Sequence, residues 1–144
     1  MAKPLYSTNC FNTLIRVAED CPTQRGEEPQ LRGGQPTVAV LQFRMIAGAP
    51  YKYTSDDVVF ATSSAGRALD TKTGKKERSL ARETFFSRGQ ACMRASPLGK
   101  RFGWGVHADA DGRIALFAVD SKRYQALAGD PEVAQTRAMR SKRA

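Results

Sequence analysis

The sequence is poor in the side chains that most often carry catalysis or bind metals. It has one histidine, His107, one tryptophan, Trp104, and three cysteines, Cys10, Cys21 and Cys92. The cysteines and the histidine do not form the close pairs typical of structural zinc sites, so we predict no metal site. Three cysteines cannot all pair within one chain, and without an export signal we expect reduced thiols.

Long hydrophobic runs are also missing. No stretch approaches the ~20 apolar residues that a membrane-spanning helix needs. Residues 1–20 lack the apolar segment of a signal peptide. The sequence therefore predicts a cytoplasmic protein that does not enter a membrane. A chain of 144 residues, 41% hydrophobic and 26% charged, has the size and composition of one globular domain, residues 1–144.

No complete nucleotide-binding or catalytic motif is present. Residues 73–76, Thr-Gly-Lys-Lys, lack the upstream glycine of a phosphate-binding loop, and Gly103-Trp104-Gly105 stops before the rest of a dinucleotide fingerprint. There is no Gly-x-Ser-x-Gly sequence of the kind that presents a nucleophilic serine. We therefore predict no cofactor, and the sequence favours a non-enzymatic role while leaving the question open.

Positive charge is concentrated in one part of the chain. Residues 1–71 carry seven Lys or Arg and seven Asp or Glu, whereas residues 72–104 carry nine cations against two acids, a net charge of +7. Clustered cations create a potential that neighbouring carboxylates do not cancel, which favours an anionic partner. Basic clusters are also common on ordinary solvated surfaces.

The spacing of apolar and turn residues predicts an α+β fold. Strands are expected over 11–18, 91–95, 102–108 and 113–119. Helices are expected over 37–47, 55–61 after an N-cap at Thr54, 77–87, 122–128 and 132–139, with a linker over 65–76. We therefore expect an antiparallel sheet of about four strands, packed with four to five helices.

The turn sequence Asp109-Ala110-Asp111-Gly112 predicts a hairpin with a three-residue loop. In that register Phe102, Trp104 and Val106 share one face with Ile114, Leu116 and Ala118, while the other face carries Gly103, Gly105, His107, Ala115, Phe117 and Val119. The two glycines leave a shallow floor. A helix or a ligand could approach the backbone there, and a packed helix is the commoner cause.

Cys92 and His107 are the candidate catalytic residues. If the 91–95 strand pairs antiparallel with the 102–108 strand, the two side chains come close, and a cysteine beside a histidine can act as an activated thiolate. The alternative is a buried cysteine that serves as a small apolar residue near a structural histidine. No acid or amide stands at a recognisable offset to orient the histidine, so the alternative is favoured.

Anion binding is the leading functional hypothesis, because guanidinium groups are suited to phosphate and carboxylate. Arg88, Arg94, Lys100 and Arg101 flank or cap the predicted hairpin. We expect the terminal helix to dock on the sheet and to hold Arg140 and Arg143 near these cations. The protein is then a non-enzymatic domain that binds a phosphate-bearing ligand or nucleic acid. The alternatives are a small enzyme using Cys92 and His107 and a structural subunit of a larger assembly, and the oligomeric state stays open. The expected ligand-binding residues are Arg88, Arg94, Lys100, Arg101, Gly103, Trp104, Gly105, Arg140 and Arg143.

Several strings of the sequence carry a resemblance to a known family. They are Ala-Glu-Asp-Cys-Pro at 18–22, Pro-Tyr-Lys-Tyr-Thr-Ser-Asp-Asp-Val at 50–58, Ala-Ser-Pro-Leu at 95–98, Lys-Arg-Phe-Gly-Trp-Gly-Val-His at 100–107 and Ala-Met-Arg-Ser-Lys-Arg-Ala at 138–144. With these strings, the chain resembles an uncharacterised bacterial single-domain family, a domain of unknown function, over nearly its whole length. The resemblance implies a single-domain protein and brings no activity with it.

Overall fold

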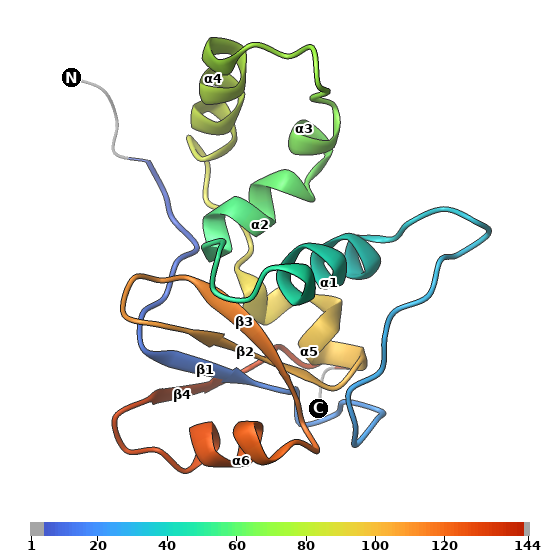
Figure 1. Cartoon of the computed structure of the whole chain (residues 1–144), viewed down its shortest axis with the longest axis vertical. Helices are drawn as coiled ribbons and strands as arrows, with labels where there is room; N and C mark the ends of the chain where they lie inside the picture. The colour runs from blue at the N-terminus through green and yellow to red at the C-terminus, as the bar shows by residue number, and fades with distance from the viewer. Residues whose placement is uncertain (1–4, 143–144) are drawn as a thin grey trace.

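The computed structural model describes residues 5–142, which form an α+β fold around one sheet. The strands are β1 (Thr13–Arg16), β2 (Trp104–Ala108), β3 (Ile114–Ala118) and β4 (Ala134–Arg137), in the spatial order β3-β2-β1-β4. Helices cover both faces of the sheet, with α1 (Val38–Gly48) and α5 (Pro97–Arg101) on one face and α6 (Lys122–Ala128) on the other (Figure 1).

The sheet is mixed, which corrects the expected antiparallel arrangement. The β1–β2 and β2–β3 pairs are antiparallel, but β4 runs parallel to β1. The chain reaches β4 from β3, at the opposite edge of the sheet, through α6. A connection that carries a helix over one face of a sheet can return the chain in the same direction, which no short hairpin can do.

The prediction of a terminal helix over 132–139 is wrong. Its central residues form β4, where the amide of Ala134 donates to the carbonyl of Asn12 at 2.8 Å and the amide of Ala138 donates to the carbonyl of Arg16 at 2.7 Å. Pro131 and the residues after it are compatible with a helix start, but the free edge of β1 offers hydrogen-bond partners that a terminal helix cannot use.

Side-chain caps define the first two helices, and the cap at Thr54 is the one that the sequence predicted. Thr37 accepts a hydrogen bond from the amide of Val40 at the start of α1. At α2 (Ser55–Ala61) the Thr54 hydroxyl accepts from the amide of Asp57, and the Asp57 carboxylate accepts from the amide of Thr54. This reciprocal capping box satisfies amides that the first turn of a helix leaves without partners.

The segment between α2 and the next long helix is more ordered than the linker expected over 65–76. It contains the single-turn helix α3 (Ser64–Arg67) and the first turn of α4 (Lys75–Phe85). Ser63 caps α3 by accepting a hydrogen bond from the amide of Gly66 at 3.1 Å. In Figure 1, α3 and α4 stand above α2, away from the sheet.

The prediction of a strand over 91–95 is wrong. Residues Met93–Ala95 form a single 3-10 turn, η1, which leads directly into α5. Ser96 caps α5 by accepting from the amide of Leu98, and Pro97 occupies the first turn, where a missing amide costs nothing. With the short α3 and α5 included, the described residues hold six α-helices rather than the four to five expected.

The hairpin forms in the expected register. Trp104 pairs with Ala118 and His107 with Ala115, and the amide of Asp109 donates to the carbonyl of Arg113 at 2.9 Å to close a three-residue loop. Gly112 has a φ of +80°. That left-handed conformation is the reason the turn needs glycine.

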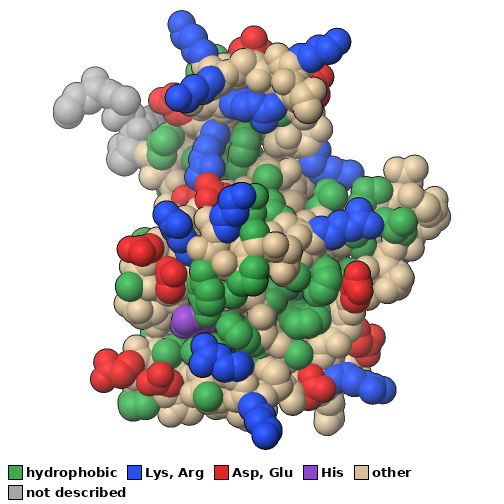
Figure 2. All heavy atoms as spheres, in the orientation of Figure 1, with side chains coloured by type: hydrophobic (Ala, Val, Ile, Leu, Met, Phe, Trp, Pro, Cys, Tyr) green, Lys and Arg blue, Asp and Glu red, His purple; other side chains and the backbone are tan. Residues whose placement is uncertain are grey.

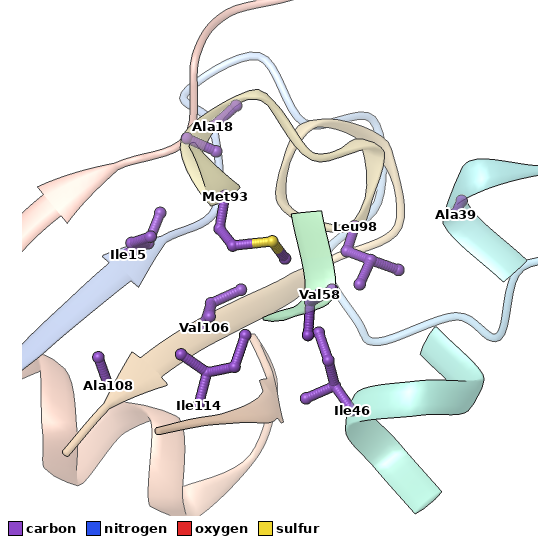
Figure 3. Close-up of a cluster of buried hydrophobic side chains, with 11 residues drawn as sticks. Ile15, Ala18, Ala39, Ile46, Val58, Met93, Leu98, Val106, Ala108 and Ile114 are labelled. Atoms are coloured by element: carbon purple, nitrogen blue, oxygen red, sulfur yellow. The ribbon is translucent and has the colours of Figure 1, made fainter. Parts of the chain in front are cut away.

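The main core lies between the sheet and the helices α1, α2 and α5 (Figure 3). Its buried side chains are Ile15, Ala18, Ala39, Ile46, Val58, Met93, Leu98, Val106, Ala108, Ile114 and Ala138. Beneath the other face, Leu14, Tyr124 and Leu127 are also buried. Within residues 5–142, no helix is long and apolar enough to cross a membrane.

Candidate functional site

Protein atoms cover the glycine floor of the hairpin. A Cβ built on Gly105 would lie 2.5 Å from the ring of Tyr124, so a helix, α6, makes the close approach there, as expected. Gly103, with a φ of +78°, would place a Cβ 2.2 Å from the carbonyl oxygen of Arg25. These two positions, proposed as ligand contacts from the sequence, are therefore occupied by α6 and by the loop that contains Arg25.

Trp104 also packs against protein over part of its surface. Its indole nitrogen donates to the carbonyl of Glu27 at 2.8 Å, and its ring centroid lies 5.3 Å from that of Phe43. The ring packs against the main core and is half-buried. Its indole is therefore held by Glu27, Phe43 and the main core.

The C-terminal segment lies close to several of the cations expected to bind anions. The Arg94 Nε donates to the carbonyl of Arg137 at 2.7 Å, and Arg140 forms an ion pair with Glu19. Arg101 lines a cavity of about 350 Å³ together with Lys142. The tail docks as expected, although through a strand rather than a helix. Arg88 is exposed beyond α4, Lys100 is half-buried on α5, and Arg143 lies outside the described residues.

Glu19 and Asp20, in the Ala-Glu-Asp-Cys-Pro string at 18–22, anchor the tail. The amides of Ser141 and Lys142 both donate to the Asp20 carboxylate at 3.0 Å. The hydrogen bond from Lys142 is the main cause that lowers the pKa of Asp20 below its ordinary value of 3.8. Both acids of this motif therefore bind the tail, and their charge offsets part of the local basic potential.

The structure does not bring Cys92 and His107 together. His107 is the strand partner of Leu14, so these side chains share the face that α6 covers. Cys92 lines a cavity with Ile15 and Thr136, which are partners in the β1–β4 pair and lie on the opposite face. The expected pairing of a 91–95 strand with β2 does not form, because Met93–Ala95 form η1. Cys92 and His107 therefore lie on opposite sides of the sheet.

His107 instead pairs with Tyr51. The Tyr51 hydroxyl lies 2.7 Å from His107 Nδ1, and the two rings meet edge to face with centroids 5.7 Å apart. Burial lowers the pKa of His107 below 6.5 and raises the pKa of Tyr51 above 10.0. Both shifts favour a neutral pair at neutral pH, in which the tautomer of His107 determines whether the hydroxyl or Nδ1 donates the hydrogen bond.

A groove of about 500 Å³ lies between α2, α3 and α4, away from the residues that the sequence singled out. One wall carries the cations Lys75, Arg78 and Arg82, spaced three and four residues apart along α4 so that they share one face of the helix. The opposite wall is mainly apolar and is formed by Met45, Tyr53, Phe60, Ala61, Gly66 and Leu69.

Arg82 sits at the inner end of the cationic wall. Its guanidinium lies 2.7 Å from the Asp57 carboxylate and 5.6 Å from the centre of the Phe86 ring. Burial acts to raise the pKa of Asp57, but hydrogen bonds from Thr54 and Arg82 outweigh it, and the pKa is lowered below 3.8. Asp57 is therefore a stable carboxylate at neutral pH that neutralises one of the three cations.

The other two cations have no carboxylate partner within residues 5–142. The Arg78 guanidinium donates to the carbonyls of Asp70 and Thr73, which fixes its direction without neutralising its charge. Figure 2 shows Lys and Arg side chains gathered over α4 at the top of the view, with hydrophobic side chains visible between them. The groove thus combines a net positive wall with an apolar wall.

Sequence reasoning included these cations in its basic segment but did not place them in a site. The available signal was the spacing of Arg78 and Arg82 on one face of the helix expected over 77–87, whereas Lys75 fell in the expected linker over 65–76. Part of the apolar wall, Met45, Tyr53 and Phe60, precedes α4 by more than a dozen residues, so only folding brings it opposite the cations. Among residues 5–142, no cluster of three or more His, Cys, Asp or Glu could hold a metal ion.

These features define an α+β protein with a mixed four-stranded sheet and a helical layer that forms an open basic groove. The chain belongs to the family of unknown function DUF6157, whose model matches residues 5–144. This confirms the resemblance to an uncharacterised family. No curated protein and no solved structure matches the chain.

Proposed function

We propose that the protein binds a small amphipathic anion, one with a phosphate or carboxylate group and an apolar or aromatic body, in the groove between α2 and α4. The proposal rests on one observation. Lys75 and Arg78, two cations without a carboxylate partner within residues 5–142, and an apolar wall line the same groove of about 500 Å³. Ligand sites of this size usually combine an apolar lining with a few directed polar groups.

The two walls select different parts of such a ligand. Lys75 and the donors of Arg78 that the carbonyls of Asp70 and Thr73 leave free offer charge-assisted hydrogen bonds to an anionic head. Tyr53, Phe60 and Leu69 offer apolar surface to the body of the ligand. Arg82 keeps its charge balanced by Asp57 until a competing anion approaches.

Nucleic acid is the other anionic partner, and salt dependence separates it from a small ligand. A nucleic acid that contacts several phosphates loses affinity steeply as salt rises, because many counterions are released. A small anion held by two cations has a shallow salt dependence, since few charges are involved. The groove favours the small ligand because its cations and its apolar wall line one confined space. A nucleic acid would need cations spread along an extended surface.

The test uses anilinonaphthalene sulfonate, a fluorescent aromatic anion, as the probe. Replacing both Lys75→Ala and Arg78→Ala should weaken probe binding by about tenfold or more, because two charge-assisted hydrogen bonds are lost. The control is Lys76→Ala together with Arg88→Ala, exposed cations outside the groove lining that give the same change in net charge. This control should change affinity by no more than about twofold.

Equal losses in the groove and control variants would refute the groove, because they would show that only net charge matters. A single-stranded oligonucleotide is titrated in parallel over a range of salt concentrations. Tight, steeply salt-dependent binding of the oligonucleotide, with weak binding of the probe, would replace the small-ligand proposal with nucleic-acid binding.

A further inference from the structure

Another cavity, of about 270 Å³, brings together two of the three cysteines. It lies where the N-terminal segment passes η1 and β4, and Cys10 and Cys92 both line it. Both residues are half-buried free thiols, although 82 positions separate them in the sequence. The remaining lining residues are Ser7, Thr8, Asn9, Ile15, Arg94 and Thr136.

The segment that carries Cys10 is held firmly against α2. The amide and the hydroxyl of Thr8 both donate to the Asp56 carboxylate, at 2.6 and 2.7 Å, and Asn9 accepts from the amide of Asp56 at 2.8 Å. Cys92 is fixed on the other side, because it directly precedes η1, whose Met93 is buried in the core. Both thiols therefore project from well-anchored backbone into the same cavity.

We propose that Cys10 and Cys92 are a peroxide-sensitive dithiol that closes into a disulfide. The two thiols act on each other rather than on a distant partner because they share one small cavity. Burial and the neighbouring Cys92 raise the pKa of Cys10 above 9.0, although Thr13 opposes this. Cys10 is therefore the poorer nucleophile toward peroxide, so the first attack falls to Cys92 and Cys10 reacts afterwards as the resolving thiol.

The chemistry needs hydrogen peroxide as the oxidant. The Cys92 thiolate attacks one peroxide oxygen, so that an S–O bond forms, the O–O bond breaks and hydroxide leaves as water after taking a proton. Cys10 then loses its proton and attacks the sulfenic sulfur of Cys92, so that an S–S bond forms, the S–O bond breaks and a second water leaves. Two thiols are oxidised by two electrons, and one peroxide is reduced to two waters.

Arg94 and the neighbouring polar groups make the cavity suitable for this reaction. The Arg94 Nε is occupied by the carbonyl of Arg137, but its terminal nitrogens keep donors and a positive charge close to the cavity. A nearby cation stabilises the hydroxide that departs from the peroxide. The closed disulfide would join the N-terminal segment to η1.

The experiment treats the fully reduced, full-length protein with about one equivalent of hydrogen peroxide under denaturant-free conditions. We expect the intact mass to fall by two hydrogen atoms, and proteolytic mapping to find one crosslink, between the Cys10 and Cys92 peptides. Cys21→Ser is the matched control, because Cys21 is also half-buried and free but does not line the cavity. This variant should give the same crosslink at the same rate.

In Cys10→Ser the resolving thiol is missing, so Cys92 should stop at sulfenic acid, which dimedone traps, and then progress to sulfinic acid. If that variant does not fold, phenylarsine oxide on the wild-type protein provides a second measurement. An arsenical that bridges two thiols should bind once per chain and protect both Cys10 and Cys92 from alkylation. Four outcomes would overturn the proposal. They are a crosslink through Cys21, a disulfide between chains, separate oxidation of Cys10 and Cys92, and failure of the arsenical to protect both thiols.

Discussion

Gly105 is the position at which one added methyl group should report most directly on the packing of α6 against the sheet. A Cβ built there would lie 2.5 and 2.8 Å from two ring carbons of Tyr124 and 3.4 Å from a methyl carbon of Leu14. Tyr124 has little room to move, because it is 4% exposed and its hydroxyl accepts the amide of Val17 at 3.1 Å.

Gly105→Ala should therefore overpack this interface. Forcing an extra methyl group into a packed core costs about 1–3 kcal/mol. At roughly 4 °C for each kcal/mol in a domain of this size, the thermal midpoint should fall by about 4–12 °C. The assay is thermal unfolding followed by circular dichroism, with urea unfolding as an independent measure of the free energy of unfolding.

Gly48→Ala is the matched control, because a Cβ on Gly48, the last residue of α1, has no neighbour within 4 Å. It should be neutral or stabilise by about 0.5–1 kcal/mol, since alanine is the better helix former. Adding Tyr124→Leu to Gly105→Ala should cost less than the sum of the two single changes, because the smaller side chain relieves the clash. A midpoint for Gly105→Ala equal to or above that of the wild type would refute the packing of α6 on Gly105.

Two further predictions concern His107 and the C-terminal segment. Burial lowers the pKa of His107 below 6.5, its value in the unfolded chain, so its contribution to stability is complete above pH 6.5 and is lost as the pH falls from 6.5 through the lower folded pKa. The free energy of unfolding should thus fall more steeply over that range in the wild type than in His107→Gln. The NMR signal of the single histidine gives the folded pKa. Equal slopes in the two proteins would show that His107 does not cause the pH dependence. Deletion of residues 139–144 should lower the thermal midpoint, because it removes the bond from the amide of Met139 to the carbonyl of Arg94 and the contacts with Glu19 and Asp20. Asp20→Ala should reproduce part of that loss, and an unchanged midpoint in the deletion would mean that the docked tail does not stabilise the fold.

The elements that the sequence predicted correctly are those whose signals lie within a few residues of one another. The capping box of α2 needs only Thr54 and Asp57, and α6 begins directly after Ser121, whose side chain accepts from the amide of Tyr124. The hairpin register follows from the Asp109–Gly112 turn, because the loop length determines which residues face each other. Local hydrogen bonds stabilise each of these features, so the sequence alone is sufficient to predict them.

The candidate site was harder to predict than the fold. The basic segment at residues 72–104 contains the cations that line the groove, but the hypothesis from the sequence singled out Arg88, Arg94, Lys100 and Arg101 rather than Lys75, Arg78 and Arg82. A cationic helix face has the same sequence pattern whether it faces water or an apolar wall. That difference depends on where α1, α2 and α3 lie, and a local pattern does not contain this information.

The composition, the local caps and the turn residues thus determined on their own an α+β chain with a basic central segment and a defined hairpin. The tertiary structure decided the rest. Residues 134–137 form a parallel strand because β1 presents a free edge, and Cys92 is separated from His107 because residues 93–95 form η1 instead of joining the sheet. The physical reason is that an edge, a cavity or a groove has partners that are distant in sequence, and their hydrogen bonds and burial outweigh the weak local preferences of short segments.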